Sequence, residues 1–167
     1  SKLAYAAFSK PEGASVPDWG LYVAKADGSE AKQISKNLGW KPEFNRDGTL
    51  IAYTGNADAQ GRGFQVAIVG ADGHGDHSVS PGGNYENDHS WDPKGQELVT
   101  HSAGEDGFHL WVTDTTGKKE RQITFDEGQH PYDINPHWSP AGDQIVFERH
   151  YKWGGSDLHL VDPYGDK

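Results

Sequence analysis

An aromatic residue followed by a tight turn recurs at a constant interval along the chain. Phe44, Trp91 and Trp138 lie 47 residues apart, and each is followed four positions later by a glycine. The three segments are Pro42–Gly48 (PEFNRDG), His89–Gly95 (HSWDPKG) and Pro136–Gly142 (PHWSPAG). A fixed period of this length is typical of a repeat architecture, in which each repeat is one supersecondary unit that packs against its neighbours.

Short apolar stretches separated by turns rich in Asp, Gly and Pro fill each repeat. Those that follow the aromatic turn are Leu50–Tyr53, Leu98–Thr100 and Gln144–Phe147. A second set consists of Leu21–Lys25, Val66–Gly70, Leu110–Asp114 and Leu158–Asp162, and a third of Lys32–Ser35, His77–Ser80 and Arg121–Thr124. No window carries a convincing helical period, so we predict four short strands per repeat.

Four strands in a repeat of this length are typical of a β-propeller blade. The prediction is therefore an all-β partial propeller that forms one unit over residues 1–167. Its repeats are expected at about 1–38, 39–85, 86–132 and 133–167. The alternative is a two-sheet sandwich, although a sandwich has no reason to keep the same order of aromatic, turn and strand at a constant interval.

The strand count leaves two blades incomplete. Lys2–Phe8 matches the second strand of a repeat, and the last repeat ends after its third strand. We therefore expect fourteen strands in groups of three, four, four and three. Because open blade edges expose unpaired backbone groups, we also expect pairing with a second copy or with the remainder of a longer propeller.

The repeats resemble those of TolB-type propellers, the WD40-like or PD40 class. The segment Asn135–Phe147 carries the resemblance best, and Asp88–Gly95 is a weaker copy. Lys41–Gly48 departs further, with Phe44 in place of Trp and Arg46 in place of the turn proline. The resemblance implies a propeller fold and a periplasmic or extracellular location. Members of the class serve as interaction domains, as parts of peptidases and as polysaccharide lyases, so the resemblance implies little about function.

Charge and composition exclude several classes of protein. Fifteen Lys and Arg residues against 25 Asp and Glu give a net charge of -10, which argues against nucleic acid or an anionic membrane surface as the partner. Cysteine is absent, which excludes disulfides, Cys-ligated metals and thiol catalysis. No apolar run approaches the ~20 residues of a membrane span.

Loops at one face of the predicted propeller provide the candidate binding surface. In a propeller, the connections between blades and those between second and third strands open around the central channel, where ligands bind. We place the binding surface at this mouth, mainly in the last two repeats. Its residues are Trp40, Glu86, His101, His130, Tyr132, Asp133, Arg149, His150, Tyr151 and Trp153.

Hairpin geometry predicts which residues face each other near the mouth. A turn at Asp92–Gly95 places His89 across from Leu98, and the equivalent turn in the last repeat places Asp133 across from Glu148, each to within one position. The aromatic residues divide by position. We expect Phe44, Trp91, Trp111 and Trp138 to pack between blades, whereas Trp40, Tyr132, Tyr151 and Trp153 either anchor a ligand or pack under loops.

The predicted function is binding without catalysis, with a protein or extended ligand held at the mouth. Histidines and carboxylates from adjacent blades could hold a divalent metal such as calcium or manganese, but no short His spacing supports this and we expect no cofactor. Resemblance to the polysaccharide lyases of the class implies the alternative, a metal-dependent uronate lyase. In that enzyme Arg149 would neutralise the sugar carboxylate, and a His or Tyr would take the proton.

Overall fold

The fold is known from a computed structural model that describes residues 1–9, 18–37, 39–56, 63–80, 88–103, 107–118, 120–125 and 132–165. These residues form fourteen strands, as predicted, and none of them is helical. No membrane-spanning helix is therefore found in the described part of the chain.

The strands fall into four antiparallel groups that we call blades 1 to 4. Blade 1 contains β1 (Lys2–Ser9), β2 (Asp18–Lys25) and β3 (Lys32–Ser35). Blade 2 contains β4 (Gly39–Phe44), β5 (Leu50–Asn56), β6 (Phe64–Gly70) and β7 (His77–Ser78). Blade 3 contains β8 (His89–Trp91), β9 (Glu97–Ala103), β10 (Phe108–Asp114) and β11 (Glu120–Gln122). Blade 4 contains β12 (Tyr132–Trp138), β13 (Ile145–His150) and β14 (Ser156–Val161).

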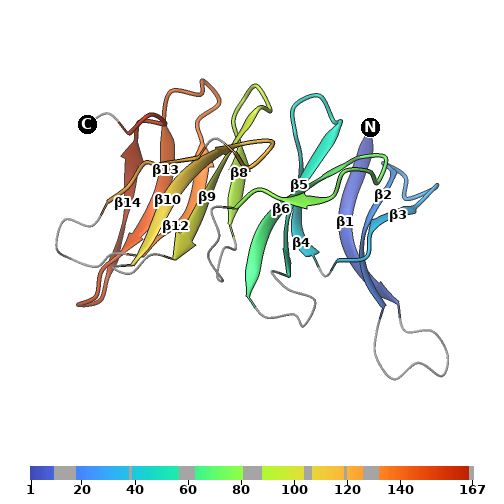
Figure 1. The fold of residues 1–167 in the computed structure, drawn as a ribbon, viewed down its shortest axis with the longest axis horizontal. Helices are drawn as coiled ribbons and strands as arrows, with labels where there is room; N and C mark the ends of the chain where they lie inside the picture. The colour runs from blue at the N-terminus through green and yellow to red at the C-terminus, as the bar shows by residue number, and fades with distance from the viewer. Residues whose placement is uncertain are drawn as a thin grey trace.

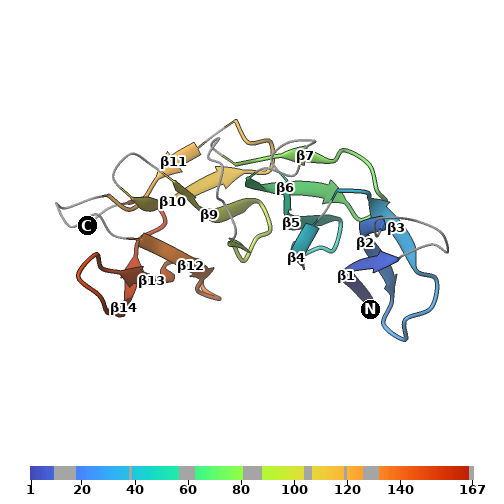
Figure 2. The ribbon, with the colours of Figure 1, turned by 90° about the horizontal axis from the view of Figure 1, so that it is seen from below.

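The blades stand side by side in a curved row (Figure 1). After a rotation of 90° about the horizontal axis, the row appears as an arc (Figure 2). The strands β7 and β11 lie on its convex side, and β4 and β12 lie on its concave side. Blades 3 and 4 are also joined directly, because Phe108 of β10 pairs in parallel with Tyr132 of β12. The predicted third and fourth sheets are consequently one continuous sheet.

One polar side chain stabilises the turn after each aromatic residue. Asn45, Asp92 and Ser139 occupy the same position, and each accepts hydrogen bonds from backbone N–H groups of the turn that follows. The glycine three residues later adopts a positive φ in all three turns, 73°, 71° and 78°, a conformation that side chains other than glycine rarely adopt. The recurring motif therefore specifies the turn through its polar residue and glycine, in addition to providing an aromatic residue for packing.

These turns shift the strand register from the predicted one. His89 pairs with Thr100, and Trp91 pairs with Leu98, so the predicted pairing of His89 with Leu98 is wrong by two positions. The cause is a longer loop: the Asp92 N–H bonds to the carbonyl of Glu97, which adds two residues to the turn.

In blade 4 the predicted strand register differs from the observed one by a single position, because the first strand contains a bulge. The register shifts between Ile134 and His137, where Asn135 has a φ of 52°. Asp133 therefore lies across from Arg149, one position from the predicted Glu148 and within the slip that the prediction allowed. Asparagine tolerates this left-handed conformation better than most residues, which explains its presence at the bulge.

The hydrophobic core lies between blades. At each junction, side chains from the third strand of one blade pack on second-strand side chains of the next, and the three resulting clusters are separate. Trp91 is buried between blades 2 and 3 and donates its indole N–H to the Glu43 carbonyl, at 3.0 Å. Phe44, Trp111 and Trp138 are half-buried. Phe44 packs against the cluster between blades 1 and 2, and Trp138 packs against the cluster between blades 3 and 4. Packing between blades is therefore confirmed for Trp91, Phe44 and Trp138.

Candidate functional site

A pocket of about 290 Å³ opens on the concave side of the arc, where the first strands of three consecutive blades meet. Its lining consists of Lys41, Pro42, Glu43, Asp88, His89, Asn135, Pro136 and His137. These residues occupy the three positions before the repeat's aromatic residue. The bulged strands β4 and β12 therefore present the same part of each repeat to one space, which we call the channel pocket.

An ion pair connects two blades across the channel pocket. The Lys41 ammonium of blade 2 contacts the Asp88 carboxylate of blade 3, and the other oxygen of Asp88 lies 3.6 Å from Nδ1 of the buried His101. Blade 4 repeats the second contact with different residues, because the Asn135 amide donates to the Glu148 carboxylate at 3.0 Å. The side chains three positions before Trp91 and Trp138 thus each contact the second strand of their own blade, whereas Lys41, at the same position before Phe44, contacts the next blade.

Burial controls protonation in the channel pocket. It lowers the pKa of the His89 imidazole to about 4, with the nearby Lys41 ammonium as the second cause. His89 is therefore neutral at pH 7, with its Nδ1 3.5 Å from the Thr54 hydroxyl of blade 2. Burial also raises the pKa of the Glu43 carboxyl, partly offset by a hydrogen bond from the Trp91 backbone. The pocket therefore combines a neutral imidazole with an already paired lysine.

Below the channel pocket, the paired ends of β12 and β13 hold an internal salt bridge. The Arg149 guanidinium donates two hydrogen bonds of 2.7 Å to the carboxylate of Asp133, whose side chain is inaccessible to solvent. Arg149 also lies over the Phe147 ring at 5.4 Å. Asp133 and Arg149, both predicted at the mouth, are therefore together but bound to each other.

A row of rings continues the mouth toward blade 3. Tyr132 is exposed and lies 5.3 Å from the Phe108 ring, which in turn lies 5.6 Å from the imidazole of His101. His150 pairs with Tyr132 across the strands and bonds to the Glu148 carboxylate at 3.0 Å. That hydrogen bond is the largest cause of a lowered pKa for the Glu148 carboxyl.

The remaining predicted aromatics lie apart from this row. Tyr151 stacks on the exposed Trp153 at 4.7 Å and bonds through its hydroxyl to His159 at 3.0 Å. Trp40 is half-buried in blade 2, edge-on to Phe64. Glu86 and His130 lie outside the described residues.

The prediction did not select several channel-pocket residues. Lys41, Asn135 and His137 lie on first strands and Asp88 directly precedes one, whereas the predicted binding surface consists mainly of loop residues. Their shared position in the repeat could have identified three of them, because Lys41, Asp88 and Asn135 each lie three residues before the aromatic residue.

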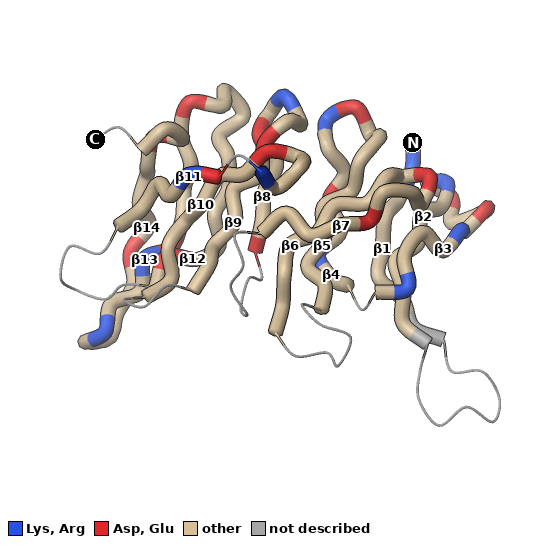
Figure 3. The backbone as a smooth tube through the Cα atoms, viewed as in Figure 1, with Lys and Arg blue, Asp and Glu red and all other residues tan. Residues whose placement is uncertain are grey.

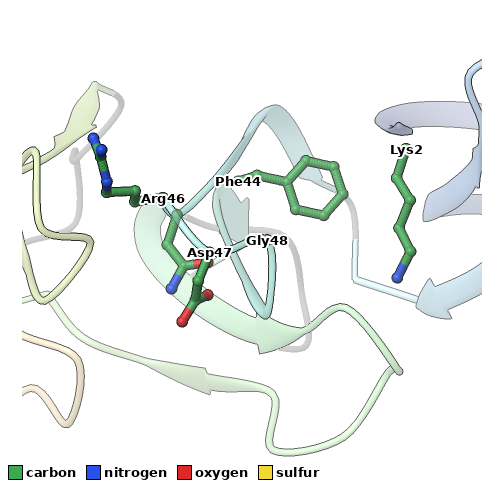
Figure 4. A pocket seen from close by; sticks show the side chains of 6 residues that line it. Lys2, Phe44, Arg46, Asp47 and Gly48 are labelled. Carbon is green, nitrogen blue, oxygen red and sulfur yellow. The ribbon is translucent and has the colours of Figure 1, made fainter.

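A second hollow of about 400 Å³ lies between β1 and the turn after β4. Figure 4 shows the Phe44 ring directed toward Lys2 across this space, with Arg46 directed away. At the equivalent positions, the Trp91 indole N–H donates to the Glu43 carbonyl and the Trp138 backbone N–H donates to the Ser90 hydroxyl, each on the first strand of the preceding blade. No such strand lies beneath Phe44 in the described part of blade 1, which accounts for the hollow.

The described side chains offer no cluster of metal-ligating residues. Within the described ranges, no three His, Asp or Glu side chains come close enough to hold a metal ion. Acidic and basic positions alternate along the turns of the upper rim (Figure 3). In the channel pocket, the charges of Lys41 and Asp88 are paired with each other, so the lining offers hydrogen-bonding groups more than a strong net charge.

The curved row of antiparallel blades, with first strands on the concave side, is an arc of a β-propeller. More particularly, it is the propeller fold found in TolB. The chain superimposes on a protein assigned as TolB in Agrobacterium tumefaciens with a TM-score of 0.75 at 21% identity, over 98% of this chain and 59% of the other. The TolB of Acinetobacter baumannii gives 0.68 at 17% identity, over 96% and 39%.

Structures with other functions share the fold as well. An oligogalacturonate lyase in complex with manganese gives a TM-score of 0.67 at 14% identity, over 93% of this chain and 49% of the lyase. The chain thus spans less than two thirds of each of these three proteins. No protein-family model and no curated protein matches it significantly. At these identities the likeness establishes the fold and leaves the function to be argued from the site.

Proposed function

We propose that this propeller arc is a non-catalytic binding module that holds a protein segment or another extended ligand along the channel pocket and the mouth below it. The observation that carries the proposal is the convergence of Lys41, Asp88 and Asn135, from three blades, on one pocket. A ligand that crosses several blades would contact equivalent positions of successive repeats, as is common for repeat proteins.

The chemistry of the pocket favours a peptide backbone as the ligand. Glu43, the neutral His89 and His137 provide acceptors and donors next to the apolar rings of Pro42 and Pro136. Below them, Tyr132 presents an exposed aromatic surface of the kind that anchors interfaces. The net charge of -10 further favours a neutral or basic partner. We place the module in the periplasm or outside the cell, as its resemblance to TolB-type propellers implies.

The pairing of Arg149 supports binding over the lyase alternative. A uronate lyase of the predicted kind needs Arg149 to meet the sugar carboxylate, whereas here both arms of its guanidinium bond to Asp133. Releasing Arg149 would leave the Asp133 carboxylate buried and uncompensated, which is costly. For the chain to act as such a lyase, the salt bridge between Arg149 and Asp133 would therefore have to break first.

An array of synthetic peptides covering basic, neutral and acidic extended sequences tests the proposal. We expect the chain to retain a subset of neutral or basic peptides, and Lys41→Ala, His137→Ala and Tyr132→Ala each to weaken binding about tenfold or more. Lys94→Ala, on the exposed turn after β8, is the matched control and should bind as the wild type does.

Two results would overturn the proposal. One is that the wild type retains peptides and none of the three alanine substitutions weakens their binding. The other is cleavage of oligogalacturonate in the presence of manganese or calcium, measured by the absorbance of the new double bond. Chelation of the metal would have to abolish this cleavage. The second result would establish the lyase alternative.

A further inference from the structure

Glu43 carries a carboxylate of the channel pocket that has no cationic partner among the described residues. The carboxylates of Asp88, Asp133 and Glu148, at the pocket and the mouth, each contact a basic side chain. The Lys41 ammonium, on the same strand as Glu43, is held by Asp88 of the next blade. The ion pair therefore leaves the negative charge of Glu43 uncompensated within the lining.

The surroundings of Glu43 favour a cation beside it. Its side chain is exposed at the pocket opening, but protein atoms of the concave side partly desolvate the carboxyl and raise its pKa. A hydrogen bond from the Trp91 backbone offsets part of this effect. A raised pKa means that the ionised carboxyl is less stabilised here than in water. A bound cation would supply the missing stabilisation.

Comparison of the repeats shows that the fold does not need a charge at this position. Glu43 and Ser90 each lie one residue before the aromatic residue of their repeat. The Ser90 hydroxyl accepts a hydrogen bond from the Trp138 backbone N–H at 3.4 Å, and the Glu43 carboxyl accepts one from the Trp91 backbone. A neutral oxygen therefore suffices for this contact with the next blade, and the negative charge of Glu43 has no role in it.

The rest of the lining suits a long side chain with an aliphatic stem. The pocket of about 290 Å³ has the volume of about ten water molecules at ~30 Å³ each. Pro42 and Pro136 provide apolar surface, against which lysine and arginine side chains bury their methylene groups. Because proline has no N–H, the backbone at these two positions can accept hydrogen bonds but cannot donate them. Apolar surface and acceptors beside a carboxylate match a cationic side chain.

We propose that Glu43 binds a cationic side chain of the ligand, an arginine or a lysine, whose stem packs against the prolines of the channel pocket. The inference rests on the proposed function and specifies which group of an extended ligand the pocket recognises. Glu43 is then the residue that determines specificity. A charge-assisted hydrogen bond is roughly twice as strong as a neutral one, and the net charge of -10 attracts basic ligands.

Titration with a single-residue probe, followed by NMR, tests the proposal. N-acetyl-arginine methylamide should shift the backbone amide signal of Trp91 in a saturable way, because this amide bonds to the Glu43 carboxyl. The citrulline analogue has a similar shape without the charge, and it should bind about tenfold or more weakly. Because the probe is a single residue, its binding does not depend on whether the peptide array retains an extended ligand.

Two variants with the same change in charge attribute the effect to Glu43. Glu43→Gln keeps an oxygen that can accept from the Trp91 N–H, and it should bind both probes equally. Glu30→Gln removes an exposed carboxylate of the turn before β3 and should keep the preference for arginine. Equal binding of the two probes by the wild type overturns the proposal. So does a preference that persists in Glu43→Gln, or a Trp91 signal that neither probe shifts.

The peptide array separates this inference from the proposed function. Peptides with an arginine or a lysine should be retained more strongly than the same peptides with citrulline or acetyl-lysine. Retention without that difference would overturn cation recognition by Glu43 and leave the binding module in place.

Discussion

Arg149 and Asp133 face each other across the β12–β13 ladder and bond through two parallel contacts of 2.7 Å. The carboxylate is fully buried, and the guanidinium is largely so. Because this pair lies where the hairpin reaches the mouth, it fixes the two strand ends from which Tyr132 and His150 extend. The salt bridge therefore positions the mouth and leaves ligand contact to its neighbours.

Removing Arg149 should destabilise the fold severely. Arg149→Ala leaves the Asp133 carboxylate buried without its partner, and we expect the free energy of unfolding to fall by about 3 to 5 kcal/mol. Urea unfolding measures this loss. Lys25→Ala is the control, because the Lys25–Glu30 pair is exposed on both sides and should contribute less than about 1 kcal/mol. Equal losses at the two sites would contradict the structural role of Arg149.

The buried His89 should make stability depend on pH. Its pKa is about 4 in the folded protein against 6.5 for an unburied imidazole, so the unfolded chain takes up a proton first as the pH falls. Stability from this group is fully present above pH 6.5 and is lost between there and pH 4, by about 3 kcal/mol in all. Unfolding measured from pH 8 to 4 should show the loss, and His89→Gln should remove that part of the slope. An unchanged pH profile in His89→Gln would refute this account.

The repeat interval predicted the strand order and the number of strands, because the aromatic, the capping side chain and the glycine recur together in every turn. The same motif did not reveal the register. A loop two residues longer than assumed and a bulge at Asn135 depend on hydrogen bonds to Asp92 and on a single φ, which no hydrophobic pattern encodes. This is why Asp133 was predicted across from Glu148 when Arg149 is its partner.

The candidate site was also predictable only in part. Tyr132, Asp133, Arg149 and His150 do cluster at the ends of β12 and β13, as the hairpin reasoning indicated. The channel pocket, in contrast, arises from three first strands that are 47 residues apart in sequence. Their convergence depends on how blades pack, which local patterns do not specify.

Trp91 and Trp153 should respond very differently to truncation. Trp91 is buried between blades and donates a hydrogen bond to Glu43, so Trp91→Ala should cost about 3 to 5 kcal/mol. Trp153 is exposed and stacks only on Tyr151 among the ring contacts described, so Trp153→Ala should cost less than about 1.5 kcal/mol. Thermal or urea unfolding of both variants provides the comparison, and similar losses would show that the core is elsewhere.

Asp76 should determine how firmly blade 1 is held to blade 2. Its carboxylate accepts hydrogen bonds from the Tyr53 hydroxyl of its own blade and from Ser35 and Asn37 of blade 1, the last two at 2.6 and 3.1 Å. Burial, together with the Asp76 carboxylate, raises the pKa of the Tyr53 phenol, which therefore stays a proton donor at neutral pH. Asp76→Ala removes the shared acceptor from all three donors at once.

Hydrogen exchange resolved by strand tests this role of Asp76. In Asp76→Ala, amide protection in β1, β2 and β3 should fall by about tenfold or more, because repeat stability depends on interfaces between neighbours. Protection in β9, β10 and β13 should stay close to that of the wild type, since those strands belong to other junctions. Asp47→Ala is the matched control: Asp47 bonds to Thr49 within its own turn, so its loss should leave blade 1 protected. A uniform loss of protection across all four blades would instead mean that the arc unfolds as one unit and that Asp76 does not act on the first junction.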